Sequence, residues 1–178
     1  LEGVGAAAYF GVFDHLLLHR KEAFFFHSRS RRPPLDRVNA LLSFAYSLLA
    51  HDCASALESV GLDAYVGFLH RDRPGRGSLA LDLMEELRPC MADRFVLTMI
   101  NNRVMTPDDF DESENGAVRM SDDARRKFLK SWQERKQDTS THPYLEEKMP
   151  WGAVPYPDSG GLPPRYRTPH TQPSEYGI

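Results

Sequence analysis

A run of apolar residues at helical spacing extends from Val38 to Val60 and constrains the core of this chain more than any other feature. Asp36 can cap a helix there, and Gly61 can end it. The spacing gathers the apolar side chains on one helix face, which has to be buried against other elements. The residues on that face are Val38, Leu41, Leu42, Ala45, Leu48, Leu49, Ala56, Leu57 and Val60. A long core helix is therefore predicted.

Most of the remaining patterns also indicate helices, so the predicted fold class is mainly α, a multi-helix domain. A short strand or extended piece is expected at 117–120, while the apolar run Tyr65–His70 does not fix its own state. Phe128, Leu129 and Trp132 should form the inner face of the last helix. Helices are expected over residues 3–18, from Ser78 to an interruption at Pro89, over 91–105, and from Ser121 to about Gln137.

The end of the chain has a different composition. From Pro150 onward, prolines recur with glycines between them, and no helical or strand period survives. We therefore expect a helical domain over residues 1–156 and an irregular, proline-rich tail over 157–178 that is extended, disordered or divergent.

Composition excludes several classes of protein. Cys53 and Cys90 lie in apolar runs, which suits buried reduced thiols in a cytoplasmic protein better than a disulfide framework. The longest apolar runs, 40–50 and 79–87, are too short and too polar to span a bilayer, so no membrane partner is expected. The net charge is only −3, so any nucleic-acid site must come from local basic clusters.

Three features can carry chemistry. His70 ends the run Gly67-Phe68-Leu69-His70, and Asp82 and Glu85 stand three positions apart on a predicted helix, hence on one face. Two like charges on an inward face repel unless a cation lies between them, and a histidine with carboxylates suits Mn²⁺ or Mg²⁺. Glu2, beside Gly3, is the third feature.

These residues alone leave other interpretations open. Asp82 and Glu85 also fit a solvated helix face, and a single histidine such as His70 is commonly a hydrogen-bonded structural residue. Glu2 by itself indicates almost nothing.

Several longer motifs resemble those of one family. The chain opens with Leu1-Glu2-Gly3, residues 32–46 read RPPLDRVNALLSFAY, and Gly67–His70 and Ser78–Pro89 follow. In this order, from Leu1 to about Tyr156, they resemble the catalytic helical domain of the CRISPR-associated spacer integrase family. Such a resemblance implies a metal-dependent DNA integrase and endonuclease that inserts foreign DNA into a CRISPR array by attack of a 3′-hydroxyl on a phosphodiester.

The resemblance also implies a metal site. The family's ligands are a glutamate before glycine, a histidine after a Gly-Phe-Leu run, and an acidic residue three positions after the aspartate of the catalytic helix. Here these are Glu2, His70 and Glu85, and they would hold Mg²⁺ or Mn²⁺. Asp82 matches the preceding acidic position and is expected to orient ligands or to bind the metal indirectly.

DNA binding would need positive charge near that metal. We expect Arg71, Arg73 and Arg76, which follow His70, to contact phosphates, although each also fits an ordinary solvated surface. The further candidates are Arg88, Arg31 and Arg32.

The family resemblance sets expectations about partners: double-stranded or branched DNA, a small companion subunit of CRISPR adaptation, and a homodimer built through a β-rich N-terminal domain. Because this chain begins at Leu1, we expect a fragment without that domain. Two other readings stay open. One is a catalytically disabled fragment that acts only as a DNA-binding or assembly module. The other is a metal-dependent hydrolase of small phosphates, which would lack the salt dependence of multi-phosphate contact.

Overall fold

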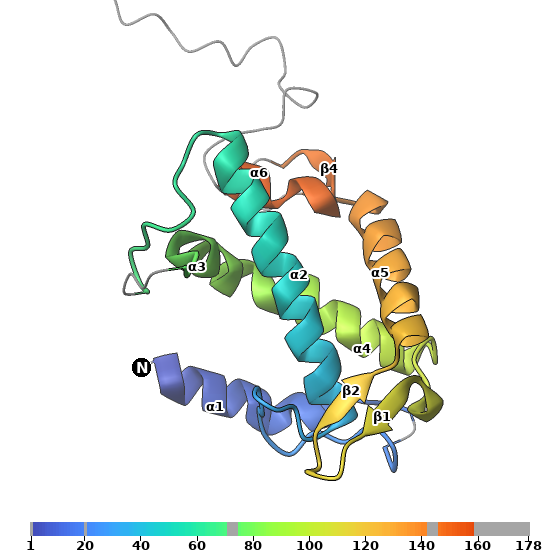
Figure 1. Ribbon diagram of the computed structural model, residues 1–178. Coiled ribbons are helices and arrows are strands. Elements are labelled where there is room, and N and C mark those ends of the chain that lie inside the picture. The colour runs from blue at the N-terminus through green and yellow to red at the C-terminus, as the bar shows by residue number, and fades with distance from the viewer. Residues whose placement is uncertain (1, 20, 71–74, 142–145, 159–178) are drawn as a thin grey trace, which may run out of the picture. The chain divides into compact units, whose positions relative to one another are not determined.

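The computed structural model of the chain describes residues 2–19, 21–70, 75–141 and 146–158 and is mainly helical, as the sequence predicts (Figure 1). Its residues form two compact units. The first unit comprises Leu1–Ala50 and Glu86–Arg135, and the second comprises His51–Glu85 and Lys136–Ile178.

The long helix expected from the apolar run is α2 (Arg37–Ser59), as predicted. Asp36 Oδ1 accepts the N–H of Asn39 at 2.7 Å and so caps its start, and Gly61 beyond its end takes a φ of +84°. By length and composition alone, α2 is long and apolar enough to cross a membrane, although the apolar run at residues 40–50 within it is too short to do so. Leu41, Ala45 and Leu49 of the predicted apolar face are fully buried, as in a core helix, whereas Leu48 and Val60 are half-buried.

Aromatic side chains fill the core of the first unit. Phe128 on α5 (Asp122–Gln137) meets Phe44 and Phe95 edge-on at centroid distances of 5.4 and 5.1 Å, and Trp132 contacts Phe95 in the same way. Rings in this geometry gain attraction beyond the area that they bury. Leu129, predicted on the inner face, is 37% exposed, because it lies one position off the stripe formed by Phe128 and Trp132.

A π-helical turn replaces the helix break expected at Pro89. Helix α3 (Ser78–Leu87) is followed directly by the π turn η2 (Arg88–Asp93) and then by α4 (Arg94–Asn101). Proline disrupts the hydrogen bonding of a regular α-helix, and the wider π turn accommodates it without ending the helical run. Cys90 in this turn is exposed, so the prediction of two buried thiols holds only for Cys53.

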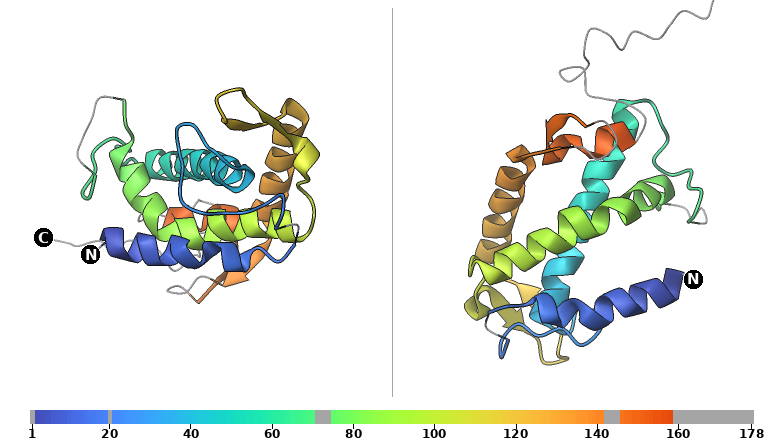
Figure 2. Two further views of the ribbon diagram at one scale, coloured as in Figure 1. Left: turned by 90° about the horizontal axis from the view of Figure 1, so that it is seen from below. Right: turned by 180° about the vertical axis from the view of Figure 1, so that it is seen from behind.

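At the N-terminus, the predicted helix is α1 (Glu2–Val12) followed by the 3₁₀ turn η1 (Phe13–Leu16). Figure 2 shows α1 running beside α4 within the first unit. The amide of Asn101 fastens the end of η1, because it accepts the N–H of Leu18 at 2.9 Å and donates to the carbonyl of Leu16 at 3.0 Å.

Two small antiparallel hairpins complete the described chain. In the first, β1 (Phe110–Glu112) pairs with β2 (Val118–Met120), Phe110 opposite Met120. The sequence predicts a short strand or extended piece where β2 forms and no strand where β1 forms. In the second, β3 (Thr139–Thr141) pairs with β4 (Lys148–Pro150).

Beyond β4, where no element is predicted, the 3₁₀ turn η4 (Trp151–Ala153) and the short helix α6 (Pro155–Asp158) form. Residues 159–178 of the predicted tail lie outside the described residues.

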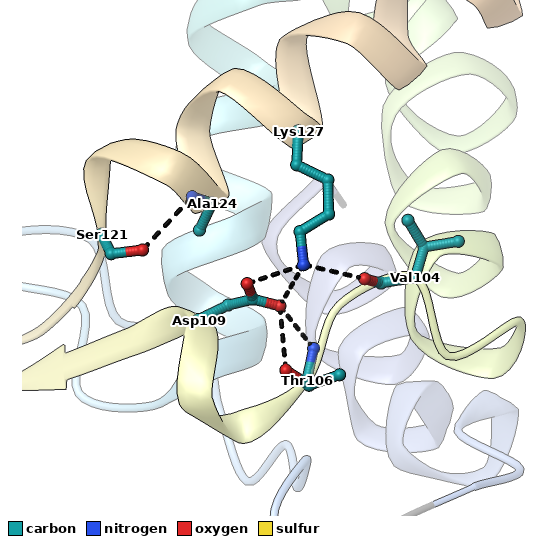
Figure 3. A network of polar contacts seen from close by, with 6 residues as sticks. All are labelled: Val104, Thr106, Asp109, Ser121, Ala124 and Lys127. Atoms are coloured by element: carbon teal, nitrogen blue, oxygen red, sulfur yellow. Dashed lines mark hydrogen bonds and ion pairs between the residues drawn. The ribbon is translucent and has the colours of Figure 1, made fainter.

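An ion pair ties the loop before β1 to α5 (Figure 3). Lys127 Nζ lies 2.6 and 2.7 Å from the two oxygens of Asp109 and also donates to the carbonyl of Val104. Asp109 accepts the N–H and hydroxyl of Thr106 as well, while Ser121 caps α5 by accepting the N–H of Ala124. Burial raises the pKa of Asp109, but these donors outweigh burial and hold the pKa below its usual range.

We expect Asp109→Asn to lower the free energy of unfolding at pH 7 by about 1 to 3 kcal/mol, since Lys127 and Thr106 lose a charged acceptor. Because the folded-state pKa is lowered, this stabilisation is present above the ordinary carboxyl pKa of about 4 and is lost as pH falls through the lowered value. Denaturant titrations of wild type and variant should therefore converge in acid. As a control, Arg126→Ala should change nothing measurable, because Arg126 and its partner Asp123 are 80% and 93% exposed.

Candidate active site around His70

The carboxylate of Asp82, on α3 in the second unit, holds the loop that carries His70. Its Oδ2 accepts the N–H groups of Phe68 and Leu69 at 2.7 and 2.9 Å, and its Oδ1 accepts the N–H of His70 at 3.1 Å. Three consecutive amides thus converge on one side chain that is only 9% exposed. The short apolar run, whose state the sequence does not fix, is therefore a loop with a defined backbone path.

The same carboxylate also fixes the histidine ring. His70 Nδ1 lies 2.6 Å from Asp82 Oδ1. Burial raises the pKa of Asp82, but the hydrogen bonds from Leu69, from the His70 ring and from the Phe68 and His70 amides outweigh it and lower the pKa below its usual value. An ionised carboxylate only accepts hydrogen bonds, so Nδ1 carries the hydrogen. Nε2 is then the nitrogen left to bind a metal or a proton, as in carboxylate–histidine pairs of metal sites.

Glu85 stands one helical turn after Asp82 on α3 and is partly exposed, and the next residue, Glu86, is exposed. Glu2 is the first residue of α1, and its side chain is not among those that the structure describes. Within the described part of the chain, no group of three or more His, Cys, Asp or Glu side chains is placed to hold a metal ion.

The donor chemistry nevertheless fits a hard divalent cation. His70 is held by Asp82 in the tautomer that leaves Nε2 available, and Glu85 adds a carboxylate one turn along the same helix. Oxygen ligands with one imidazole suit Mn²⁺ and Mg²⁺. His70 and Glu85, both in the second unit, could therefore contribute ligands to such an ion.

Close packing locks the start of the loop against α3. A Cβ added at Gly67 would lie 2.5 Å from Ser78 Cβ and 2.8 Å from the His70 carbonyl oxygen. Ser78 is itself fully buried, so it cannot move aside. Phe68 and Leu69, next in the chain, are 89% and 80% exposed. Backbone contacts rather than side-chain burial thus hold His70 in place.

The arginines predicted to contact DNA have different surroundings. Arg31 and Arg32 are exposed and Arg76 is partly exposed, while Arg71 and Arg73 lie outside the described residues. Arg88 is partly buried in the first unit, and its guanidinium lies 4.7 Å from the centre of the Tyr46 ring. That contact is a cation–π interaction.

A second buried carboxylate, in the first unit, was not singled out from the sequence. Asp93 is 1% exposed and accepts hydrogen bonds from the hydroxyls of Tyr9 at 2.8 Å and Tyr46 at 2.5 Å. Burial raises the pKa of Asp93, and burial together with Asp93 raises the pKa of both tyrosines. Arg29 lies 5.2 Å from the Tyr46 ring centre, and burial lowers its pKa. The one available signal in the sequence was an aspartate within an apolar helical run.

We expect Gly67→Ala to lower the free energy of unfolding by about 1 to 3 kcal/mol, because the added methyl group overpacks a rigid contact. It should also shift the amide resonances of residues 68–70. The matched control is Gly77→Ala, whose new Cβ would meet Ala64 O at 3.5 Å and Ala80 Cβ at 3.6 Å, both ordinary contacts. Denaturation and ¹⁵N NMR spectra compare the two; equal effects would show that His70 is not held by this packing.

Comparison with known proteins relates the chain to a known family. The family model described as CRISPR associated protein Cas1 matches residues 1–134. A CRISPR-associated endonuclease Cas1 from Rhodospirillum rubrum is 59% identical over 155 residues, which is 87% of this chain and 45% of that protein. Another, from Leptospira interrogans, is 51% identical over 155 residues, 87% of this chain and 61% of that protein. The chain thus spans about half the length of the curated relatives it matches.

Solved structures with the same fold agree. A casposase bound to its integration product superposes with a TM-score of 0.76 and 32% identity, over 87% of this chain and 43% of the casposase chain. A Cas1 protein from Thermotoga maritima also gives 0.76, with 28% identity over 88% of this chain and 47% of its own. A Cas6-RT-Cas1–Cas2 complex gives 0.74, with 28% identity over 89% of this chain and 17% of the matched chain.

Proposed function

This chain belongs to the CRISPR-associated Cas1 family, and from that membership we propose that it is the catalytic helical part of a divalent-metal-dependent DNA integrase and endonuclease. The observation that carries the proposal is the fixed ring of His70, with Nδ1 held 2.6 Å from Asp82 and Glu85 one turn further along α3. The names of the relatives, CRISPR-associated endonucleases, and the shared fold of a casposase bound to its integration product support it.

We assign the ligands of the metal to Glu2, His70 and Glu85. Asp82 would stay outside the ligand set, because its oxygens already accept three amides and the histidine ring. Its role would be to hold the His70 ring through Nδ1 and so leave Nε2 for the ion. Bound Mn²⁺ or Mg²⁺ would supply the positive charge that stabilises the negative charge developing on the phosphate oxygens.

The proposed reaction is phosphoryl transfer between DNA strands. The 3′-hydroxyl oxygen of incoming DNA forms a bond to the phosphorus of a phosphodiester in the CRISPR repeat. The attacking hydroxyl gives up its proton to water, the bond from that phosphorus to the leaving oxygen breaks, and the leaving oxygen takes up a proton from water. No protein nucleophile is needed, and water in place of the 3′-hydroxyl gives nuclease activity instead.

The partners of this function are also proposals, because the chain spans about half of the relatives it matches. Arg71, Arg73 and Arg76 would neutralise phosphates of double-stranded or branched DNA next to His70. One structural relative is named as a Cas1–Cas2 complex, which supports a small companion subunit. We further propose that the protein acts as a homodimer in the cytoplasm of a prokaryote.

Strand transfer on a branched DNA that mimics a half-integrated spacer tests the proposal, with Mn²⁺ present. His70→Ala and Glu85→Ala should each lower the rate by more than about a hundredfold, beyond the 10- to 100-fold typical of residues that only orient a ligand. Glu86→Ala is the matched control, since it removes an exposed carboxylate from the same helix and should leave the rate unchanged.

The same strand-transfer rates distinguish an integrase from a DNA-binding or assembly module. If His70→Ala and Glu85→Ala match wild-type activity, the assigned metal site is wrong. If the wild type binds branched DNA but transfers no strand in any divalent metal, the chain is a DNA-binding or assembly module.

A further inference from the structure

A buried amide holds the arginine-bearing loop that leads into α2. Asn39 is fully buried, and its Oδ1 accepts the N–H of Ser30 at 3.0 Å and Arg29 Nη1 at 2.7 Å. Its Nδ2 donates to the Ser28 carbonyl at 2.8 Å and to Asp36 Oδ2 at 2.6 Å. The amide thus spends its whole hydrogen-bonding capacity on this loop of the first unit, so the loop has a defined path.

Arginine side chains from two parts of the first unit meet near the ring of Tyr46. The guanidinium of Arg29 lies 5.2 Å from the ring centre, and that of Arg88, on η2, lies 4.7 Å from it. Burial is the largest cause of the lowered pKa of Arg29, and the positive charges of Arg31 and Arg88 lower that pKa further. Arg31 and Arg88 are therefore both close enough to Arg29 to repel it.

The first unit balances this positive charge only in part. Among the described groups whose charges act on Arg29, the carboxylate is Asp93, which is 1% exposed and accepts the hydroxyls of Tyr9 and Tyr46. Arg31 is exposed and, within the described residues, has no ion-pair partner. One carboxylate cannot balance three guanidiniums, so positive charge remains in excess.

A phosphate group has the chemistry that suits such a cluster. Guanidinium groups bind phosphate oxygens through paired N–H donors, and a bound anion would relieve the repulsion between the arginines. Arg31 is exposed and Arg88 is partly exposed, whereas the Nη atoms of Arg29 already donate within the loop and to α2. The exposed Arg32 adds positive charge next to Arg31, which favours a chain of phosphates over a single one.

We propose that Arg31 and Arg88 together bind a backbone phosphate of DNA beside the Tyr46 ring, supported by the partly buried Arg29. All of these residues belong to the first unit, so the site uses no residue of the loop that carries His70. The inference deepens the proposed function and rests on it in one respect, because DNA is taken as the source of the phosphate. From the sequence, Arg31 and Arg88 are separate candidates for DNA contact, whereas the structure places both beside Arg29.

Fluorescence anisotropy of a labelled DNA duplex, measured in EDTA over a range of salt concentrations, tests the proposal without metal or activity. Arg31→Ala should weaken binding about tenfold, the effect of losing a hydrogen bond to a charged group. It should also reduce the slope of log K against log salt by about 0.9, the value for one lost phosphate contact. Arg31→Lys should keep the slope, because the charge remains, and lose part of the affinity, because the paired donors are gone.

The matched control is Arg126→Ala on α5. It removes the same charge from the same unit, but Asp123 lies 3.2 Å from that guanidinium and already balances it. Arg126→Ala should therefore leave the affinity within about twofold of the wild type and the slope unchanged. An equal effect of Arg31→Ala and Arg126→Ala would show that only the net charge of the surface matters.

A double-mutant cycle then asks whether Arg31 and Arg88 hold the same phosphate. If they do, Arg31→Ala combined with Arg88→Ala loses less affinity than the product of the two single losses. Denaturant titration checks that each variant is folded, since Arg88 also packs on Tyr46. Fully independent losses, an unchanged slope in Arg31→Ala, or a wild type that does not bind the duplex overturn the proposal.

Inorganic phosphate separates the possible sources of the anion. If calorimetry shows that Arg31→Ala abolishes binding of inorganic phosphate while duplex binding is unchanged, the site takes a free anion and the assignment to DNA is wrong. Failure of the proposed function would look different. His70→Ala and Glu85→Ala would then leave strand transfer unchanged, and the salt slopes would still decide on Arg31 and Arg88.

Discussion

The geometry around His70 depends on a single buried carboxylate. Asp82 accepts three successive backbone N–H groups and the imidazole, so the loop and the ring are fixed together. Phe68 and Leu69 are exposed and contribute almost no burial, so the hydrogen bonds to Asp82, together with the close approach of Gly67 to Ser78, set the path of the loop. A protonated Asp82 would lose much of this hold, and its lowered pKa keeps it ionised throughout the physiological pH range.

The two carboxylates that stand three residues apart on α3 differ in exposure and in hydrogen bonding. Asp82 is nearly buried and its oxygens are fully engaged, whereas Glu85 is partly exposed one turn further along the same helix. A carboxylate whose oxygens already accept several hydrogen bonds orients a ligand well but has few lone pairs left for an ion. We therefore assign Asp82 as the group that positions His70, and Glu85 as the candidate metal ligand.

The sequence predicts much of the fold and of the candidate site. The features that it does not predict have physical explanations. Helical spacing predicts α2, and the caps Asp36 and Ser121 locate two helix starts, because these signals are local. The three-residue strand β1 has too few residues for a period, and its partner β2 defines it. Spacing also places Asp82 and Glu85 on one face, but only the fold shows that Asp82 faces three amides of a loop twelve to fourteen residues away.

Asp93 illustrates the same limit. Its donors, Tyr9 and Tyr46, lie 84 and 47 residues away in the chain, and no local pattern indicates that both hydroxyls meet one carboxylate. Pro89 signals a helix end by local rules, yet the π turn carries the helical run past it and includes Asp93.

The proposed site requires a divalent ion to bind beside His70. The most direct measurement is NMR line broadening by substoichiometric Mn²⁺, which acts only on nuclei near the ion and requires no activity. We predict that amides of residues 68–70 and 82–85 broaden first, together with those next to Glu2. Broadening that begins instead in the acidic segment 108–114, which carries Asp108, Asp109, Asp111, Glu112 and Glu114, would contradict the claim.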